Sequence, residues 1–539
     1  MIEKILQTKI KDAISGLGHD VLLTDIVIET TRDDKHGDYA TNIAMKLAQV
    51  FKKNPRDIAQ LIIEKIDRTH INKIEVAGPG FINFFIDDLY LGQVITDIFH
   101  LKDHYGDGEK KDEVINIEFV SANPTGRLHL GHARGAALGD SLARLLIKDG
   151  YNVIREFYVN DAGVQINNLG ASLYIRYLNL HGIAAELPED AYHSADLIAV
   201  AQKLNEEIGA KYINDKELGE RYFAKKGSDL FLEIIKDDLA RFRVLFDIYS
   251  YETKVKEDNP LDELIKKLDQ YIYQEEGALF LKTSLFGDDK DRVIVKSNGE
   301  HTYFLPDIQY HLIKLRNENT NLINIFGADH HGYITRMKAA LQMFNYDENI
   351  LDVIIMQLVR LIKDGAELKM SKRTGTAVTL DELIDDVGVD AARYFFIAKS
   401  ASTHFDFDLD LAVSKSNANP VFYAQYAHAR LSAVLERGKE FGFKTDNLVL
   451  SELGERNLIK HLIAYPLMIK DSARTREPYK VANYIQQLAA YIHSFYTESK
   501  IVDETNIELS KARLSLAKAA KLVMKNALHL IGVSAPDKM

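Results

Sequence analysis

The segment from residue 113 to residue 140 constrains the fold more than any other part of the chain. Apolar and polar residues alternate over 115–119, which predicts a strand. Turn-forming residues follow at 123–126, and a helix is predicted to begin near His129. A second strand is predicted at 153–159, and the order strand, helix, strand predicts a parallel sheet with a right-handed crossover. A ligand site is then expected beyond the carboxyl ends of these strands.

Three glycines recur at every fourth position of this predicted helix. Gly131, Gly135 and Gly139 therefore fall on one face, and a face without side chains lets a helix lie close against a sheet. Their spacing matches neither the dinucleotide-binding fingerprint nor the Walker loop, so the segment indicates neither NAD binding nor P-loop chemistry.

A pair of histidines stands at the start of the same helix. His129 and His132 are three residues apart, so they point the same way, next to free backbone N–H groups and the positive end of the helix dipole. This arrangement suits a polyphosphate. An isolated pair of this kind is better explained as ordinary surface or core histidines, so the ligand interpretation depends on what else the chain contains.

Composition limits the possible classes of function. The 539 residues give room for three to five domains of roughly 100–200 residues each. The chain has no cysteine, which excludes disulfides, thiolate metal sites and a cysteine nucleophile, and fits a reducing cytoplasm. The first residues lack the layout of a signal peptide, and no apolar run reaches the ~18 residues of a membrane span. We therefore expect a cytoplasmic protein with no membrane partner.

Charge is distributed unevenly along the chain. The net charge of −12 by itself argues against a nucleic acid partner. Residues 420–539, however, contain 17 Lys and Arg against 12 Asp and Glu, and such a basic segment is compatible with phosphate contacts. A helix predicted at 510–531 carries a row of lysines for which a solvated face is the simpler interpretation: Lys511, Lys518, Lys521 and Lys525.

The chain is predicted to divide into three parts. Residues 1–108 mix helix and strand patterns and form a separate α+β unit. Residues 109–400 hold the parallel sheet, with a polar, helix-rich insertion at about 180–290. Residues 401–539 have no strand pattern and are expected to be all helical.

Local patterns predict further elements within these parts. Residues 39–51 and 55–65 are expected to be helices. Residues 292–296 are expected to resume the central sheet after the insertion. A tight turn at residues 364–365 predicts a β-hairpin, and the chain is expected to be helical from residue 381 onward.

Two motifs far apart in the chain together resemble the signatures of class I aminoacyl-tRNA synthetases. Residues 123–132, Asn-Pro-Thr-Gly-Arg-Leu-His-Leu-Gly-His, resemble the HIGH signature, and residues 369–373, Lys-Met-Ser-Lys-Arg, resemble the KMSKS loop. Two motifs in this order are much more specific than either one alone. Further stretches narrow the resemblance to bacterial-type arginyl-tRNA synthetases, at 118–123, 158–163, 327–333 and 419–430.

The resemblance implies a fold and a reaction. The fold is multidomain α/β, with a Rossmann-like parallel-sheet catalytic domain, an α+β N-terminal domain that contacts tRNA and an all-α anticodon-binding domain. In the reaction, the arginine carboxylate attacks the α-phosphorus of ATP, and a terminal tRNA hydroxyl then attacks the arginyl-adenylate. The implied partners are L-arginine, tRNA(Arg) and ATP with Mg²⁺, with no metal held by the protein. The family also implies a monomer whose arginine activation depends on bound tRNA.

The resemblance assigns roles to the two signatures. His129 and His132 are expected to donate hydrogen bonds to ATP, and Lys369 and Lys372 to hold the leaving pyrophosphate, so these four are the expected catalytic residues. The plainer interpretation of residues 369–373 is an exposed basic loop. The full set expected to bind ATP is Asn123, Pro124, Thr125, Gly126, His129, Gly131, His132, Lys369, Met370, Ser371 and Lys372.

The arginine site is expected among carboxylates near the strand ends, because a guanidinium needs planar acceptors. Tyr303 and Asp307 match positions that the family uses for arginine, although Asp307 could equally be the N-cap of a helix at 308–317. Glu118 is expected to hold the α-amino group, since a buried carboxylate without a cationic partner is costly. The full expected set is Glu118, Ser121, Asn123, His132, Tyr303, Asp307 and His330.

Other interpretations stay open from the sequence. Asp329, His330 and His331 could ligate a metal, but neighbouring side chains diverge and no third ligand is evident, so a pocket wall is favoured. The chain could be a class I synthetase for another amino acid, an inactive RNA-binding relative or a small-molecule nucleotidyltransferase. The two intact signatures oppose the inactive relative, and the extra terminal domains oppose the nucleotidyltransferase.

Overall fold

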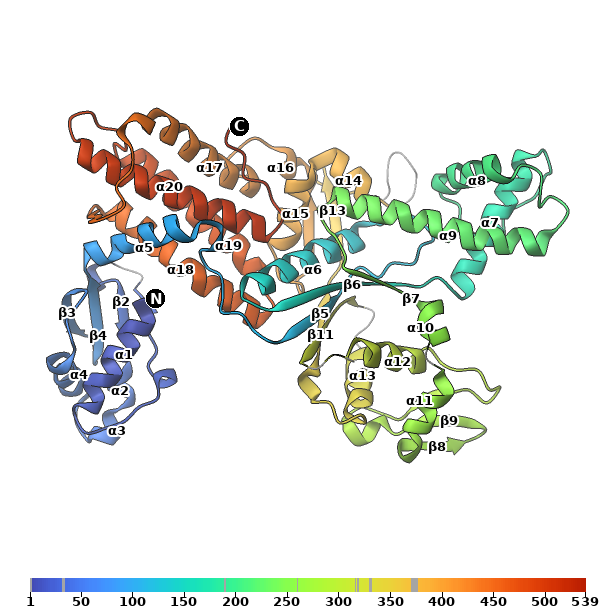
Figure 1. Cartoon of the computed structure of the whole chain (residues 1–539), viewed down its shortest axis with the longest axis horizontal. Coiled ribbons are helices and arrows are strands. Elements are labelled where there is room, and N and C mark those ends of the chain that lie inside the picture. Colours follow the sequence, from blue (N-terminus) through green and yellow to red (C-terminus); the bar gives the residue numbers. More distant parts are fainter. Residues whose placement is uncertain are drawn as a thin grey trace.

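A five-stranded parallel sheet lies at the centre of the molecule (Figure 1). The structure is a computed structural model that describes residues 2–31, 34–188, 191–258, 260–315, 317, 319–328, 332–369 and 377–539. The strand order is β12-β11-β5-β6-β7, and every neighbouring pair is parallel, as predicted. The strands are β5 (Val114–Glu118), β6 (Asn152–Val159), β7 (Ile248–Tyr251), β11 (Thr320–Gly327) and β12 (Leu351–Met356).

Helix α6 (Leu130–Lys148) connects β5 to β6 and is buried along most of its length. A Cβ at Gly139 would lie 2.2 Å from the ring of Phe119, so this position needs glycine. A Cβ at Gly135 would lie 3.6 Å from the Met356 side chain, which is ordinary contact. The prediction of a close helix approach is therefore confirmed at Gly139, whereas Gly135 has room for a side chain.

The N-terminal unit is an α+β fold that stands apart from the body of the molecule in Figure 1. Its antiparallel sheet has the order β1-β2-β4-β3. Helix α5 (Asp88–Leu101) leads from this unit into the body. The remaining elements are β1 (Glu29–Thr30), β2 (Tyr39–Thr41), β3 (Ile71–Ala77), β4 (Phe81–Ile86), α1 (Ile2–Ser15), α2 (Ile43–Lys46), α3 (Ala48–Phe51) and α4 (Pro55–Lys65).

Of the helices predicted at residues 55–65 and 39–51, the first is confirmed and the second is partly wrong. Helix α4 spans the predicted residues, and the Asn54 side chain caps it by accepting from the Arg56 N–H at 2.9 Å. The helix expected over 39–51 begins instead as strand β2. Tyr39 and Thr41 are both buried against β4, a period-two burial that a helix would not give.

The range 180–290 contains more than an insertion. Helices α7 (Val164–Leu180), α8 (Ala195–Ile208) and α9 (Lys216–Arg241) form an arm with its own apolar core, which projects from the sheet (Figure 1). After the arm, β7 pairs in parallel with β6, so part of the central sheet lies inside this range. The chain then forms α10 (Glu252–Asp258) and α11 (Leu261–Lys267) and enters a second lobe.

This lobe corrects the expected position of residues 292–296. Strand β10 (Arg292–Val295) exists, but it pairs antiparallel with β9 (Ala278–Leu281), which pairs with β8 (Ile272–Glu275) in a separate three-stranded sheet. Ile294 of β10 belongs to an apolar cluster with helices α12 (Phe304–Lys314) and α13 (Tyr333–Gln342), and this cluster packs against Leu322 and Leu351 of the central sheet. The short apolar run could not indicate which sheet it joins.

The predicted hairpin is confirmed, but a strand follows where only helices were expected. Strands β13 (Val359–Lys363) and β14 (Ala366–Glu367) are joined through Asp364 and Gly365, whose φ angles are 52° and 73°. Strand β15 (Phe405–Asp408) pairs in parallel with β13. Its alternation places Phe407 in the core, while Asp406 pairs with Arg360 across the ladder at 2.8 Å.

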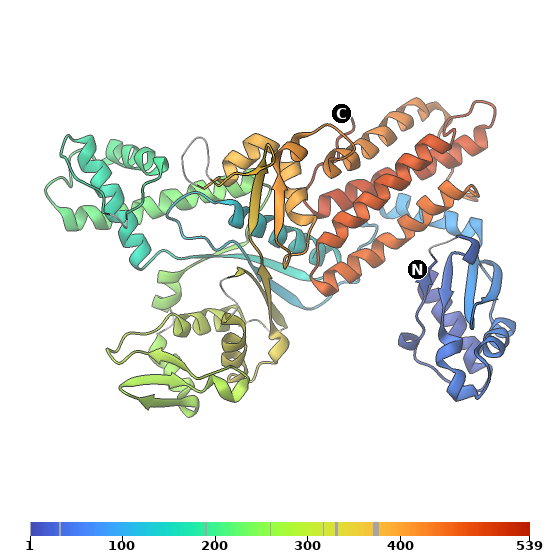
Figure 2. The same cartoon turned by 180° about the vertical axis from the view of Figure 1, so that it is seen from behind.

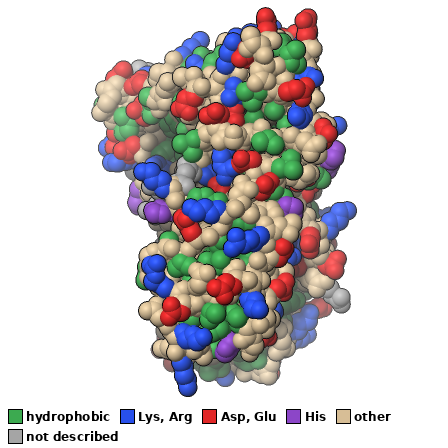
Figure 3. Space-filling model, turned by 90° about the vertical axis from the view of Figure 1, so that its left-hand side faces the viewer, with side chains coloured by type: hydrophobic (Ala, Val, Ile, Leu, Met, Phe, Trp, Pro, Cys, Tyr) green, Lys and Arg blue, Asp and Glu red, His purple; other side chains and the backbone are tan. Residues whose placement is uncertain are grey.

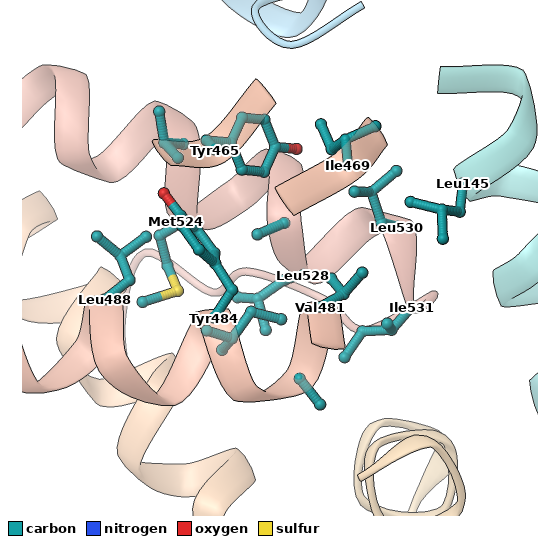
Figure 4. Packing of buried hydrophobic residues seen from close by; sticks show 14 of the residues in the cluster. Leu145, Tyr465, Ile469, Val481, Tyr484, Leu488, Met524, Leu528, Leu530 and Ile531 are labelled. Carbon is teal, nitrogen blue, oxygen red and sulfur yellow. The ribbon is translucent and has the colours of Figure 1, made fainter. Parts of the chain in front are cut away.

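The C-terminal helices share one core with α6 of the central sheet. Figure 4 places Leu145 of α6 beside Ile469, Leu530 and Ile531 of the helical region. Figure 2 shows the same helices from behind, running away from the sheet. These are α14 (Leu380–Val387), α15 (Val389–Ile397), α16 (Leu409–Val413), α17 (Pro420–Arg437), α18 (Leu453–Thr475), α19 (Tyr479–Glu498) and α20 (Ile507–Leu530).

The lysines of α20 are engaged within the molecule. Lys511 pairs with Glu508, Lys521 with Asp537 and Lys525 with Asp103, while Lys518 lies 4.2 Å from the Phe443 ring centroid. Figure 3 shows the side of the molecule formed by the N-terminal unit and the outer end of the helices, where basic and acidic side chains are interspersed. Among the described residues, none of the helices is long and apolar enough to cross a membrane.

Candidate active site

Two histidines close the N-terminus of α6. His129 is the N-cap, and its ring stacks on that of His132 with the centroids 3.8 Å apart. His129 Nδ1 accepts a hydrogen bond from the Gly131 N–H at 3.1 Å, and His132 Nδ1 accepts one from the His129 N–H at 3.3 Å. The expectation that backbone N–H groups are free beside the pair is therefore wrong for these two groups, because the imidazoles occupy them.

The same hydrogen bonds define what the rings can donate. Burial lowers the pKa of His129, and burial together with His129 lowers the pKa of His132 to about 3, so both rings are neutral at neutral pH. A neutral imidazole whose Nδ1 accepts carries its proton on Nε2. Each ring thus presents one Nε2–H donor, which suits a phosphate or ribose oxygen.

The chain leaves β5 through a turn in a left-handed backbone conformation. Val120 has a φ angle of 68° and Ser121 one of 39°, and a β-branched residue in this region is strained. The Ser121 hydroxyl donates to Glu118 Oε1 at 3.0 Å and accepts from the Tyr158 N–H at 3.1 Å. The turn therefore fixes the end of β5 to the end of β6, where a ligand site was expected.

The remaining residues expected to bind ATP follow this turn. The Thr125 N–H donates to the Asn123 carbonyl at 2.8 Å, and a Cβ at Gly126 would meet nothing within 4 Å. Lys369 is exposed and lies just beyond β14. Several expected site residues lie outside the described residues: Asp329, His330, His331, Met370, Ser371 and Lys372.

The segments that flank the two signatures are in direct contact. The Leu380 N–H donates to the Leu128 carbonyl at 2.8 Å, and His129 forms a β-bridge with Thr379. Thr379 in turn caps α14, accepting from the Glu382 N–H at 3.2 Å. The chain that follows the second signature is therefore held against the first signature itself.

Glu118 has a cationic partner that the sequence did not indicate. Lys314 Nζ of α12 donates to Glu118 Oε2 at 2.7 Å and to Asn324 Oδ1 at 3.2 Å, and the Lys314 and Glu118 side chains are 1% and 5% exposed. The inference that buried Glu118 implies a cationic ligand is therefore wrong, because Lys314 already neutralises it. Its place in an arginine site stays a prediction.

Asp307 is inside α12 rather than at its cap. The helix begins at Phe304, and the N-cap is Tyr303, whose side chain makes no capping hydrogen bond and is 78% exposed. The alternative of an Asp307 N-cap opening a helix at 308–317 is therefore wrong, because Pro306 falls in the first turn, where no N–H is needed. Burial and the nearby charge of Glu118 raise the pKa of Asp307 to about 7, with Arg336 opposing the shift.

The charges of four carboxylates act on Tyr158: three of them stand at the carboxyl ends of β5, β6 and β7, and the fourth is on α12. Burial first, and then these four charges, raise the pKa of Tyr158 far above its usual value. Such a concentration of negative charge suits a cationic ligand. The carboxylates are Glu252, Asp307, Glu118 and Asp161.

Glu252 was missed in the sequence because it lies within the range treated as an insertion. It is 7% exposed, directly follows β7 and pairs with Lys256. The only available signal was its position after the short apolar alternation of residues 248–251. No group of three or more side chains able to hold a metal ion occurs within the described ranges.

Family models match three successive parts of the chain. The description "Arginyl tRNA synthetase N terminal domain" covers residues 4–86, and "tRNA synthetases class I (R), catalytic domain" covers residues 94–432. The description "DALR anticodon binding domain" covers residues 424–539.

Curated relatives and solved structures agree with these models. Proteins named arginine–tRNA ligase from Bacillus licheniformis and Bacillus subtilis are 48% and 47% identical, each over 100% of this chain and 99% of the relative. A structure of an arginyl-tRNA synthetase from Campylobacter jejuni has a TM-score of 0.78 at 34% identity, covering 84% of this chain and 100% of that one. The Thermus thermophilus arginyl-tRNA synthetase has a TM-score of 0.78 at 21% identity over 100% of both chains, a likeness of fold. With the chain that follows the second signature held against the first, and with these relatives along its whole length, the chain belongs to the class I arginyl-tRNA synthetase family.

Proposed function

We propose that this chain ligates L-arginine to tRNA(Arg) through an arginyl-adenylate, consuming ATP and releasing pyrophosphate and AMP. The arginyl-tRNA product serves translation in the cytoplasm. The observation that carries the proposal is the proximity of two features at one edge of the sheet. A pair of neutral histidine donors stands at the head of α6, and carboxylates crowd the ends of the neighbouring strands. The first feature suits a triphosphate, and the second suits a guanidinium.

In the first step, the side chains of this protein form no covalent intermediate. They hold hydrogen-bond donors and positive charges next to ATP. The Nε2–H groups of His129 and His132 donate to ATP oxygens, and the ammonium groups of Lys369 and Lys372 take up the charge that develops on the leaving pyrophosphate. Mg²⁺ enters with ATP as part of that substrate. In the second step, the tRNA hydroxyl attacks the activated carbonyl, and AMP leaves.

For arginine, we assign the guanidinium to Asp307 and Glu252. Both carboxylates lie near Tyr158, and ionised Asp307 is costly in this environment until a cation arrives. Glu118 already accepts hydrogen bonds from Lys314 and Ser121. Its main effect on the α-amino group of arginine is therefore electrostatic attraction rather than a direct hydrogen bond. Ser121, Asn123, His132, Tyr303 and His330 complete the proposed pocket.

For tRNA, we assign base contacts to a hollow between α17 and α19. The guanidinium carbon of Arg430 lies over two tyrosine rings, 4.5 Å from the centroid of Tyr426 and 5.0 Å from that of Tyr496. A cavity of about 330 Å³ adjoins them, and its lining includes Tyr496, Arg437 and Lys500. Aromatic faces beside basic side chains are suited to stacked bases and their phosphates. The α+β domain at 1–108 would contact another part of the same tRNA.

The decisive experiment is ATP–pyrophosphate exchange on the full-length chain, with arginine, lysine or citrulline, each with and without tRNA(Arg). Exchange with arginine alone among the three, followed by charging of tRNA(Arg), is expected. Citrulline tests the charge requirement, because it keeps the shape of arginine but is neutral. Exchange with another amino acid would identify a different synthetase, and binding of tRNA without any exchange would identify an inactive RNA-binding protein.

A further inference from the structure

Arg127 joins the first signature to three other elements. It lies two residues before His129, and its Nε donates to Asp196 Oδ1 of α8 at 3.2 Å. Its Nη1 donates to both oxygens of Asp238 on α9, at 3.1 and 3.3 Å. The same Nη1 lies 3.5 Å from Asp381 Oδ2 of α14. One guanidinium therefore meets carboxylates from two of the three helices of the arm and from the helix that follows the second signature.

A second arginine, Arg241, shares a carboxylate with Arg127. Arg241 of α9 pairs with Asp381 and also with Asp385, at 2.5 Å for the latter. Among the described residues, the groups that face Arg127 and Arg241 from α8, α9 and α14 are Asp196, Asp238, Asp381 and Asp385. The guanidinium of Arg127 is held tightly, because removing it would leave Asp196, Asp238 and Asp381 as like charges close together.

The contacts of Arg127 run parallel to a backbone link between the first signature and the start of α14. Leu380 is hydrogen-bonded to Leu128, directly beside Arg127 in the chain, and Asp381 follows Leu380 at the start of α14. The side-chain bridge from Arg127 to Asp381 and the backbone bridge from Leu128 to Leu380 therefore join the same two segments. A planar guanidinium with several donors fixes orientation in a way that one ammonium cannot.

We propose that Arg127 is a positioning residue for the reaction, holding the segment before His129 at a fixed distance and angle from the arm and from the start of α14. The histidine pair is thereby fixed relative to the chain that leads out of the second signature. Arg127 acts through the segments it joins rather than by touching ATP. This inference rests on the proposed function, since the reaction it supports is adenylate formation.

The test compares Arg127→Met with the full-length wild-type chain in arginine-dependent pyrophosphate exchange with tRNA present. The expected result is a fall in kcat of about 10- to 100-fold, because small misplacements of reacting groups have effects of this size. The KM for arginine should stay within about twofold, since the arginine carboxylates are on other segments. The matched control is Arg292→Met in the outer lobe, which also removes an arginine paired with two aspartates and should leave kcat unchanged.

A double variant separates positioning from stability. Removal of Arg127 leaves Asp238 buried without its cation, so Arg127→Met is expected to lower the melting temperature, and adding Asp238→Asn should restore it. The kcat should remain low in the double variant, because the bridge is still missing. Recovery of kcat together with the melting temperature would overturn the inference, and so would a kcat within twofold of wild type in Arg127→Met.

Two further measurements keep the test decisive. If Arg127→Met does not fold, Arg127→Lys replaces it in the comparison. An intermediate kcat is then expected, and a kcat equal to that of the wild type would contradict the inference.

The pH dependence of kcat is the second measurement. Burial raises the pKa of Asp238 to about 6, although the charge of Arg127 opposes this shift. At saturating arginine, kcat should therefore decrease below about pH 6, where Asp238 becomes protonated and the ion pair is lost. That fall should be absent in Asp238→Asn, and an unchanged fall would count against the bridge. Absence of exchange in the wild-type chain would instead refute the proposed function.

Discussion

At the scale of single residues, protonation and hydrogen bonding decide which atoms can act. His132 is an example, since its Nδ1 is engaged by the backbone and its pKa is lowered to about 3. It is thus a neutral donor through Nε2, and no proton transfer by its imidazolium is needed. Asp307 is the opposite case, because its pKa is raised to about 7. Whether its carboxyl group is ionised at neutral pH therefore depends on whether a cationic ligand is bound.

We predict that His132→Asn lowers the kcat for pyrophosphate exchange by on the order of 10²–10³-fold, as expected when one donor to a developing charge is lost. The asparagine amide reaches only the position of Nδ1, which serves the backbone. His132→Gln is the matched control, because its amide nitrogen reaches approximately the position of Nε2, and it should retain more activity. Equal losses in the two variants would argue against the Nε2 role.

We predict that arginine binding strengthens as pH rises through about 7, because Asp307 must lose its proton to pair with the guanidinium. Bound arginine stabilises the ionised form and so lowers the pKa of Asp307, and a proton is released on binding at neutral pH. Asp307→Asn should raise the KM for arginine by about 10²–10³-fold and remove this pH dependence, with little effect on the KM for ATP. Titration calorimetry in buffers of different ionisation enthalpy measures the proton release, and its persistence in the variant would contradict the assignment.

At the scale of elements, α6 shows how one helix supports a site at its first residue. Its N-terminus carries the histidine pair, and its side chains contact the segments around the second signature. Arg134 donates to the carbonyls of Gln357 and Ser400 at 2.6 and 2.9 Å, and thereby fixes α6 to the chain after β12 and after α15. The position of the site therefore depends on how closely α6 packs.

We predict that Gly139→Ala destabilises the fold by roughly 1–3 kcal/mol, because its Cβ would overlap the Phe119 ring. Gly135→Ala on the same face is the control, and it should be neutral or stabilising by up to about 1 kcal/mol, since alanine favours helix and the site has room. Urea unfolding of both variants measures the difference. Similar destabilisation in the two would mean that the helix approaches the sheet differently.

At the scale of the whole molecule, the helical region and the catalytic unit are one packed body. Arg393 is fully buried and donates to Asp140 of α6 at 2.5 Å and to the Ile531 carbonyl at 2.8 Å. Leu145 of α6 packs beside Leu530 and Ile531 (Figure 4). A chain ending near residue 405 would expose this core, so coupling between the tRNA-binding region and the active site has to be tested on the full-length protein.

We predict that pyrophosphate exchange by the full-length chain requires tRNA(Arg), because a ligand on the helical region can bias α6 through their shared core. The tRNA affinity should fall steeply with salt, since phosphate contacts release counterions. Exchange rates with and without tRNA, at two salt concentrations, measure both effects. Undiminished exchange without tRNA would exclude the coupling and leave the ligase assignment intact.

The sequence by itself determined the central strand–helix–strand unit, the hairpin at Asp364 and Gly365 and the two signatures, because each depends on local periodicity, turn chemistry or adjacent residues. Tertiary structure alone decided that residues 292–295 leave the central sheet and that Phe405–Asp408 form a strand, since strand pairing joins residues distant in sequence. It also decided the partners of the charged residues. Lys314 neutralises Glu118, and Arg127 bridges the first signature to the arm and to the start of α14, because a buried charge needs an opposite charge nearby and the fold decides which residues meet.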